Sequence, residues 1–114
     1  MASIVEEKSF AFAVRIVRLS LFLRHNKKEY ELSKQILRAG TSVGANISEA
    51  QQAQSKADFV SKMSIALKEA VETDYWIRLL YSTGFLTENG ESSLLTDCRE
   101  IERMLTAILR TSKD

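Results

Sequence analysis

Residues 31–54 read ELSKQILRAGTSVGANISEAQQAQ, and this stretch contains no proline. Its apolar side chains recur every three or four positions, a spacing typical of an amphipathic α-helix. They form one face of the expected helix: Leu32, Ile36, Val43, Ile47 and Ala50. The segment therefore predicts a long helix that packs on one side against a helical core.

The rest of the chain favours three more helices of similar length. Its 114 residues include no proline and four glycines, and a sheet would need turn residues that this composition does not supply. We expect helices over about 4–24, 31–54, 56–83 and 88–111. Short polar breaks between them indicate antiparallel neighbours, so residues 1–114 are predicted to form one all-α, up-down-up-down four-helix bundle.

Three local signals mark helix ends. Ser3 and Glu6 have the spacing of a capping box at the start of the first helix. Ser55 is a suitable N-cap for the third helix, and Gly84 is expected to end that helix in a left-handed conformation.

The first and third helices carry more apolar surface than one core-facing stripe requires. The first has two opposed stripes, one of Phe10, Val14, Val17 and Leu21, the other of Phe12, Ile16, Leu19 and Leu23. On the third, Ile65, Trp76 and Leu79 lie roughly opposite the side that carries Phe59, Met63, Ala66, Ala70 and Ile77. We expect a homo-oligomer whose interface comprises Phe12, Ile16, Leu19, Leu23, Ile65, Trp76 and Leu79. The alternative is a single wide core-facing surface on each helix.

A polar line flanks the apolar face of residues 31–54 and comprises Arg38, Ser42, Asn46 and Glu49. Serine and asparagine are poor helix formers, which favours a buried, hydrogen-bonded role over a solvated flank. We expect Asn46 and Glu49 to be more than half buried, with partners on another helix or subunit.

Gly40 and Gly44 lie one turn apart in the same helix, where each costs about 1 kcal/mol relative to alanine. Close approach of another helix is the first explanation, and a ligand against the exposed backbone is the second.

No catalytic, cofactor or metal site can be assembled from the sequence, so we expect a non-enzymatic protein. His25 is the one histidine and lies at a predicted helix end, where capping explains it. Glu69 and Glu72 are a weak metal signal by themselves. Cys98 lies in the apolar stripe of the last helix, so we expect a buried thiol.

Net charge is +1, but the charge is uneven, with six Lys/Arg against two Glu in residues 1–28. The candidate contacts to nucleic-acid phosphates are Arg15, Arg18, Lys27, Lys28, Arg99, Arg103 and Arg110. The alternative is a solvated charged face. A single cysteine, no signal peptide and no run of about 18 apolar residues favour a cytoplasmic location without a membrane partner.

Two stretches, LSKQILRAGTSVGANISEA at 32–50 and ALKEAVETDYW at 66–76, resemble the four-helix-bundle family named for 23S rRNA intervening sequences. Arg38, Ser42, Asn46 and Glu49 match the family pattern, whereas Ala50 stands where the family usually has glycine.

The resemblance implies a bundle whose family has no established biochemical role, some members being encoded inside insertions in bacterial 23S rRNA genes. The fold is also similar to the accessory variability protein of diversity-generating retroelements, a pentameric barrel that acts with a reverse transcriptase and binds nucleic acid. That similarity implies a homo-oligomer, a pentamer by analogy, with RNA or DNA and a reverse transcriptase as partners.

Two functions stay open at this point. One is an oligomeric RNA-associated bundle, which basic residues gathered on one face would favour. The other is a protein-interaction scaffold without nucleic-acid binding, which scattered arginines paired with acids would favour.

Overall fold

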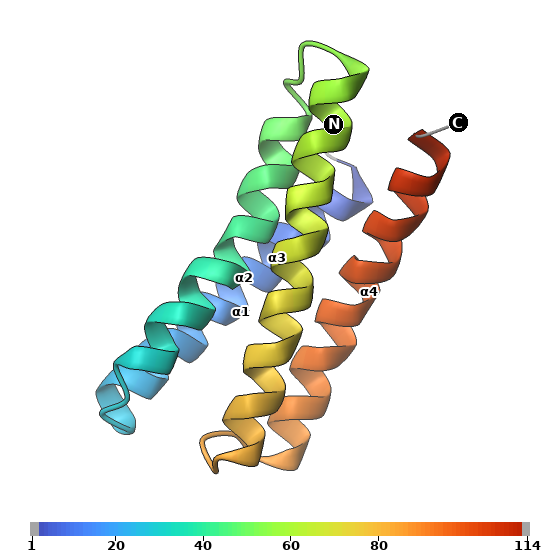
Figure 1. The fold of residues 1–114 in the computed structure, drawn as a ribbon. Coiled ribbons are helices and arrows are strands. Elements are labelled where there is room, and N and C mark those ends of the chain that lie inside the picture. The colour runs from blue at the N-terminus through green and yellow to red at the C-terminus, as the bar shows by residue number, and fades with distance from the viewer. Residues whose placement is uncertain (1–2, 113–114) are drawn as a thin grey trace.

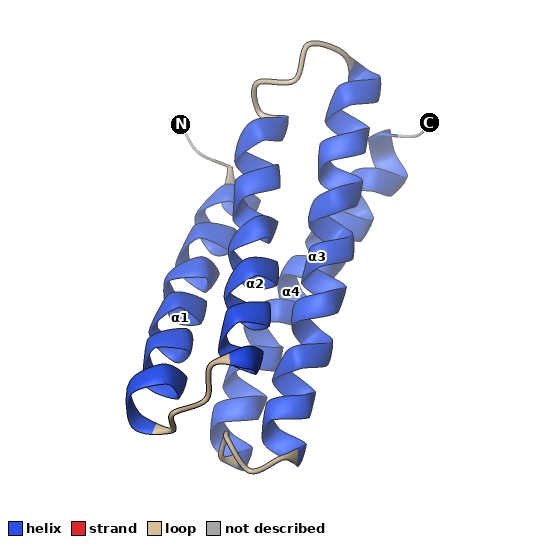
Figure 2. Cartoon of the chain, turned by 60° about the vertical axis from the view of Figure 1, so that its left-hand side comes forward, coloured by secondary structure: helices blue, strands red, loops and turns tan. Residues whose placement is uncertain are grey.

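The computed structural model describes residues 3–112 and consists there of four helices joined by short turns (Figure 1). They are α1 (Ile4–Asn26), α2 (Glu31–Ala50), α3 (Lys56–Ser82) and α4 (Glu88–Ser112). Contacts join α1 with α2, α2 with α3, α3 with α4, and α1 with α4. The diagonal pairs make no such contact among the described residues. Consecutive helices run in opposite directions, which confirms the up-down four-helix bundle (Figure 2).

The cap signals act as the sequence indicates. Ser3 Oγ accepts a hydrogen bond from the Glu6 amide, and Glu6 Oε1 accepts one from the Ser3 amide, which completes the capping box. Ser55 Oγ accepts a hydrogen bond from the Asp58 amide at the start of α3. Gly84 follows the end of α3 with φ +87°. The two side-chain caps explain where α1 and α3 begin, and the left-handed conformation of Gly84 explains where α3 ends.

The end of α2 differs from the expectation, because the helix stops at Ala50 rather than at residue 54. The amides of Gln51, Gln52 and Ala53 bond to carbonyls three residues back, which tightens the chain into a turn. Extended backbone at Ser55 then starts α3. The apolar pattern alone did not show this change of hydrogen bonding.

The core lies between all four helices, and α2 buries the face that its spacing predicts. Ile36, Val43 and Ile47 are fully buried, and Leu32 packs against the cluster. The core-facing side expected for α3 is also confirmed, because Met63 and Ile77 are buried in this cluster.

The assignment of the two α1 stripes to core and interface was wrong. Phe12, Ile16, Leu19 and Leu23 are 0–9% exposed and belong to the core of the single chain, so a second subunit cannot reach them. The opposite stripe faces outward, and we call its four residues the outer face of α1: Phe10, Val14, Val17 and Leu21. Two opposed stripes of similar hydrophobicity have the same helical period, so the period cannot show which of them faces the neighbouring helices.

Gly40 and Gly44 allow α1 to lie close to α2, as the first of the two explanations states. A Cβ atom at Gly40 would lie 2.7 Å from Ile16 Cγ2, and one at Gly44 would lie 3.3 Å from the Ser9 carbonyl oxygen. The absence of side chains at these positions therefore sets the distance between the two helices.

Among the described residues, no helix has the length and apolar character needed to cross a membrane.

Candidate functional site

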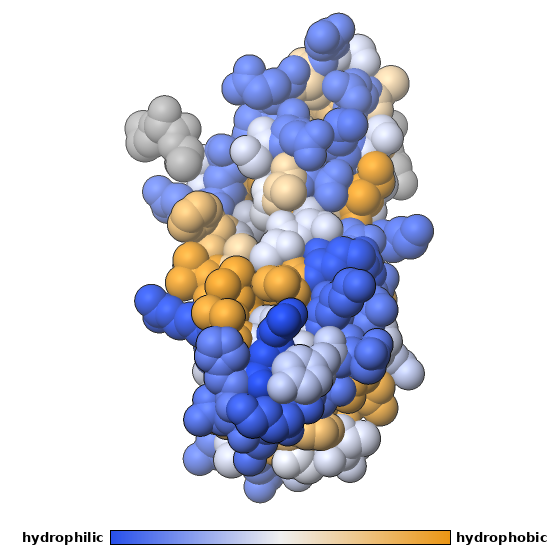
Figure 3. Space-filling model, turned by 90° about the vertical axis from the view of Figure 1, so that its left-hand side faces the viewer, coloured by the Kyte–Doolittle hydropathy of each residue, from blue (hydrophilic) through white to orange (hydrophobic). Residues whose placement is uncertain are grey.

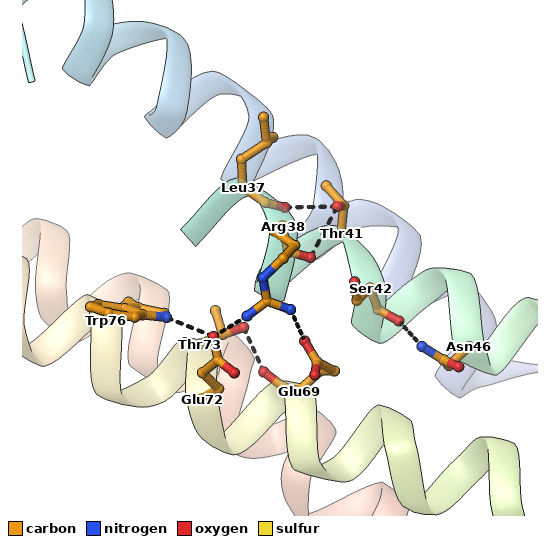
Figure 4. A network of polar contacts seen from close by, with 9 residues as sticks. All are labelled: Leu37, Arg38, Thr41, Ser42, Asn46, Glu69, Glu72, Thr73 and Trp76. Carbon is orange, nitrogen blue, oxygen red and sulfur yellow. Dashed lines mark hydrogen bonds and ion pairs between the residues drawn. The ribbon is translucent and has the colours of Figure 1, made fainter. Parts of the chain in front are cut away.

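Arg38 joins α2 to α3 through two glutamates (Figure 4). Its Nη1 donates to Glu69 Oε2 at 2.9 Å, and its Nη2 donates to Glu72 Oε2. Trp76 Nε1 donates to the same Glu72 oxygen at 3.0 Å. The Glu69 side chain is 12% exposed, so the guanidinium stabilises a carboxylate that is largely removed from water. The pair of glutamates that gave a weak metal signal is thus an ion-pair partner of Arg38.

The rest of the polar line does not cross between helices in the single chain. Asn46 is half-buried, and its Nδ2 donates to the Ser42 carbonyl of its own helix at 2.8 Å. Glu49 is exposed in the last turn of α2, with no ion pair to a described residue. The expectation of burial therefore holds for Asn46 and is wrong for Glu49, where α2 ends beside solvent. Within the single chain α2 itself satisfies the Asn46 amide, and a partner on another subunit stays a prediction.

A second polar cluster connects α3 to α4 around the buried Asp74. Arg78 Nε donates to Asp74 Oδ1 at 2.9 Å, and Arg99 Nε donates to Asp74 Oδ2 at 3.0 Å. The Cys98 thiol donates to the Ala70 carbonyl at 3.3 Å. Asp74, Cys98 and Glu102 each place one possible metal-ligand atom within 4.8 Å of the other two. Two guanidinium groups already bind the Asp74 carboxylate, however. The arrangement fits an interhelical contact.

Together, burial and hydrogen bonding raise the pKa of Glu102 and of Cys98 in this cluster and lower that of Asp74. Burial raises the pKa of Glu102 to about 7, and its hydrogen bond to Asp74 adds to that rise. For Asp74 burial opposes ionisation, but hydrogen bonds from Arg99, Glu102 and Arg78 outweigh it and lower the pKa to about 2. Burial also raises the pKa of the Cys98 thiol, which disfavours the thiolate that a nucleophile needs.

The seven candidate basic residues do not form one surface. Arg15 is held by α4, where its Nη1 donates to Asp97 Oδ2 at 2.7 Å and its Nη2 donates to Ser93 Oγ at 2.9 Å. Arg99 is held by Asp74. The other five are exposed: Arg18, Lys27 and Lys28 towards the end of α1, and Arg103 and Arg110 on α4. The ion pairs of Arg15 and Arg99 favour the hypothesis of a protein-interaction scaffold.

Residues at the turn between α1 and α2 join the exposed cations there. The Arg24 guanidinium carbon lies 5.9 Å from the ring centroid of Tyr30, and Lys27 Nζ lies 5.8 Å from that of Phe22. Sequence analysis missed Arg24, Phe22 and Tyr30. The available signal was the three Lys/Arg within residues 24–28, with an aromatic residue two positions away on each side.

An apolar patch lies at about mid-height on the side of the molecule formed by α1 and α2, among hydrophilic side chains (Figure 3). Phe10 is 70% exposed, and Val17 and Leu21 of the same face are also exposed. A hollow of about 630 Å³ lies beside Phe10 and is lined on the α2 side by small residues, among them Gly44 and Ala45. Exposed apolar residues contiguous with a hollow are typical of a docking surface.

The α3 residues expected to lie in the oligomer interface differ in their exposure to solvent. Ile65 is 41% exposed, whereas Trp76 and Leu79 are half-buried and Trp76 is hydrogen-bonded to Glu72. Val71 and Tyr75, which the sequence reading did not include, are more exposed, at 51% and 49%. We call Ile65, Val71 and Tyr75 the outer face of α3.

Comparison with known proteins gives one family and a solved structure. A family model described as 23S rRNA-intervening sequence protein matches residues 2–107. The chain is similar to a crystal structure of a protein of unknown function from the S23 ribosomal protein family of Bacteroides thetaiotaomicron, with 54% identity and a TM-score of 0.92. That match covers 93% of this chain and 98% of the other. A search of curated proteins gave no significant match.

Proposed function

We propose that this chain, which belongs to the 23S rRNA-intervening sequence protein family, is a non-enzymatic helical bundle that assembles with copies of itself and binds RNA. The observation that carries the proposal is the outer face of α1, an apolar surface left uncovered by the single chain. Exposed basic residues outside this face supply the contacts to nucleic acid.

The positions of α1 and α3 favour a head-to-tail assembly. These helices are diagonal in the bundle and each buries its opposite side in the core, so their outer faces lie on different sides of the molecule. If the outer face of α1 in one copy packs on the outer face of α3 in the next, the contact is heterologous and leads to a closed ring or an open filament. A ring agrees with the pentamer that the fold resemblance implies.

Assembly would also explain how a chain of net charge +1 could bind RNA. One copy offers few exposed cations, and its binding at physiological salt would be weak. A ring repeats the same cations, and linked sites raise apparent affinity by about 10²–10⁴-fold without new contacts.

Light scattering with and without a structured RNA tests both parts of the proposal. We expect a mass of several chains at micromolar concentration, and a further increase when RNA is added at low salt. Anisotropy titrations at two salt concentrations should show weaker binding at the higher one, because neutralised phosphates release counterions. A strict monomer would contradict assembly, and no binding to RNA or DNA at low salt would contradict the nucleic-acid function.

A protein-interaction scaffold is the second candidate, and the ion pairs of Arg15 and Arg99 favour it. On that reading the outer faces of α1 and α3 would bind a different protein, and the exposed cations would be solvated. An assembly that forms normally and does not bind RNA, DNA or single strands at low salt would support the scaffold.

A further inference from the structure

The end of the bundle where α1 turns into α2 gathers positive charge. Residues 18–34 contain five Lys/Arg and two Glu, and the five cations are all exposed: Arg18, Arg24, Lys27, Lys28 and Lys34. Within residues 3–112, no ion pair joins these five side chains to an acid. Glu29 instead accepts a hydrogen bond from the Ser33 amide at the start of α2. The cations are therefore available to an external anion.

Two exposed aromatic rings lie among these cations. Tyr30 is 52% exposed beside Arg24, and Phe22 is 41% exposed beside Lys27. Arg24 and Lys27 each lie within 6 Å of the centroid of the neighbouring ring, the range of a cation–π contact. These contacts reduce the freedom of both rings while leaving much of each ring open to solvent.

The turn itself is fixed by its backbone. The amides of Lys27 and Glu29 both donate to the Leu23 carbonyl, at 3.2 and 2.9 Å. Lys28 has φ +55°, the left-handed region that favours glycine or asparagine. A lysine at this position places two consecutive ammonium groups on a turn that these backbone hydrogen bonds close.

We infer that the α1–α2 end binds a short single-stranded segment of nucleic acid, with bases stacked on Tyr30 and Phe22 and phosphates bound by the surrounding lysines and arginines. The inference rests on the proposed function and adds to it a site and a preferred ligand. Bases expose their π faces only when they are unpaired, so a duplex would contact the cations alone and forgo the stacking. Hydrophilic side chains cover this end, below the apolar surface (Figure 3).

Anisotropy titrations with the full chain test the site. The probes are a fluorescein-labelled oligouridylate, the matching oligothymidylate and a duplex RNA of the same length, so the single-stranded arms also separate RNA from DNA. We expect single strands to bind more tightly than the duplex. The variant Phe22→Leu/Tyr30→Leu should bind single strands about tenfold more weakly for each ring removed, with little change for the duplex. The matched control is Tyr81→Leu, an exposed tyrosine on α3.

Charge variants separate this site from the broader proposal. Lys27→Gln/Lys28→Asn keeps a residue that tolerates the left-handed turn, and should lower the salt slope by about 0.7 for each phosphate that is no longer neutralised. The matched charge control is Lys68→Gln, an exposed lysine on α3 outside the candidate set, which should bind as the wild type does. Arg103→Gln/Arg110→Gln on α4 should weaken single-strand binding less than the turn variant does.

Three results would overturn the inference while leaving RNA binding in place. They are unchanged binding by Phe22→Leu/Tyr30→Leu, a preference for the duplex, and loss of binding only in Arg103→Gln/Arg110→Gln. No binding by the wild type to any probe would overturn both proposals, and binding to phosphatidylserine vesicles in its place would assign these cations to a membrane surface.

Discussion

Gly40 shows how a single residue sets the distance between two helices. A methyl group here would lie 2.7 Å from Ile16 Cγ2 and 2.8 Å from Ile16 Cγ1, both in the core. Alanine adds about 1 kcal/mol of helix propensity, but overpacking costs about 1–3 kcal/mol. We therefore expect Gly40→Ala to destabilise the fold by about 1 kcal/mol in urea unfolding. Gly44→Ala, with its nearest contact at 3.3 Å, should cost less. A more stable Gly40→Ala protein would contradict this account.

Substitution of Arg38 measures how much one interhelical ion-pair cluster contributes to the free energy of unfolding. Its side chain is 50% exposed, which weakens the pairing, but removing it leaves the 12% exposed Glu69 carboxylate without a cation. We expect Arg38→Ala to cost about 1–2 kcal/mol by urea unfolding. In the background Glu69→Gln/Glu72→Gln the same substitution should cost much less, because no carboxylate remains to be neutralised. Equal losses in the two backgrounds would show that the arginine acts through packing of its aliphatic part.

The free energy that the polar cluster between α3 and α4 contributes to folding should depend on pH. The pKa of Glu102 is raised from 4.5 to about 7, so the folded chain holds this proton more tightly than the unfolded chain. Its stabilising contribution is complete below pH about 4.5 and is lost as the pH rises through about 7. The pKa of Asp74 is lowered from 3.8 to about 2, so its contribution is present above pH about 4 and is lost as the pH falls through about 2.

Urea unfolding at about pH 5 and about pH 8 measures the Glu102 contribution. We expect the wild type to lose about 1–2 kcal/mol between them from this group, allowing for its partial exposure. Glu102→Gln keeps an N–H donor towards Asp74 and does not titrate, so its loss should be smaller. The matched control, Glu88→Gln in the exposed first turn of α4, should keep the wild-type pH dependence. An unchanged pH dependence in Glu102→Gln would show that protonation of Glu102 does not cause the loss of stability.

Local signals predict the elements better than they predict contacts between them. The capping box at Ser3 and the N-cap at Ser55 need only neighbouring residues, and both are present in the structure. The choice between Phe10 and Phe12 needs the position of α2, which the period of α1 does not contain. The Asp74–Arg99 pair joins residues 25 positions apart and depends on how far α3 and α4 are shifted along each other's axes. Arg38 was identified as important, but its partners on α3 were not.

At the scale of the whole molecule, the placement of the two outer faces predicts the kind of symmetry. The α1 variant Phe10→Glu/Val17→Glu and the α3 variant Val71→Glu/Tyr75→Glu change exposed residues only, so both should fold. Charges in the interface should make each variant smaller than the wild type by light scattering. A matched control is Ile4→Glu, because Ile4 is 63% exposed and lies about 120° away from Phe10 around α1.

Mixing the two variants distinguishes a heterologous contact from an isologous one. In a heterologous contact the intact α1 face of one variant meets the intact α3 face of the other, so a mixture of the two should form a dimer with one chain of each. No further growth is possible, because every remaining face carries glutamates. If each face packed on its own copy, the variants would form symmetric contacts alone, and mixing would create no species specific to the pair. A mixture in which each variant keeps its own mass would therefore contradict the head-to-tail assembly.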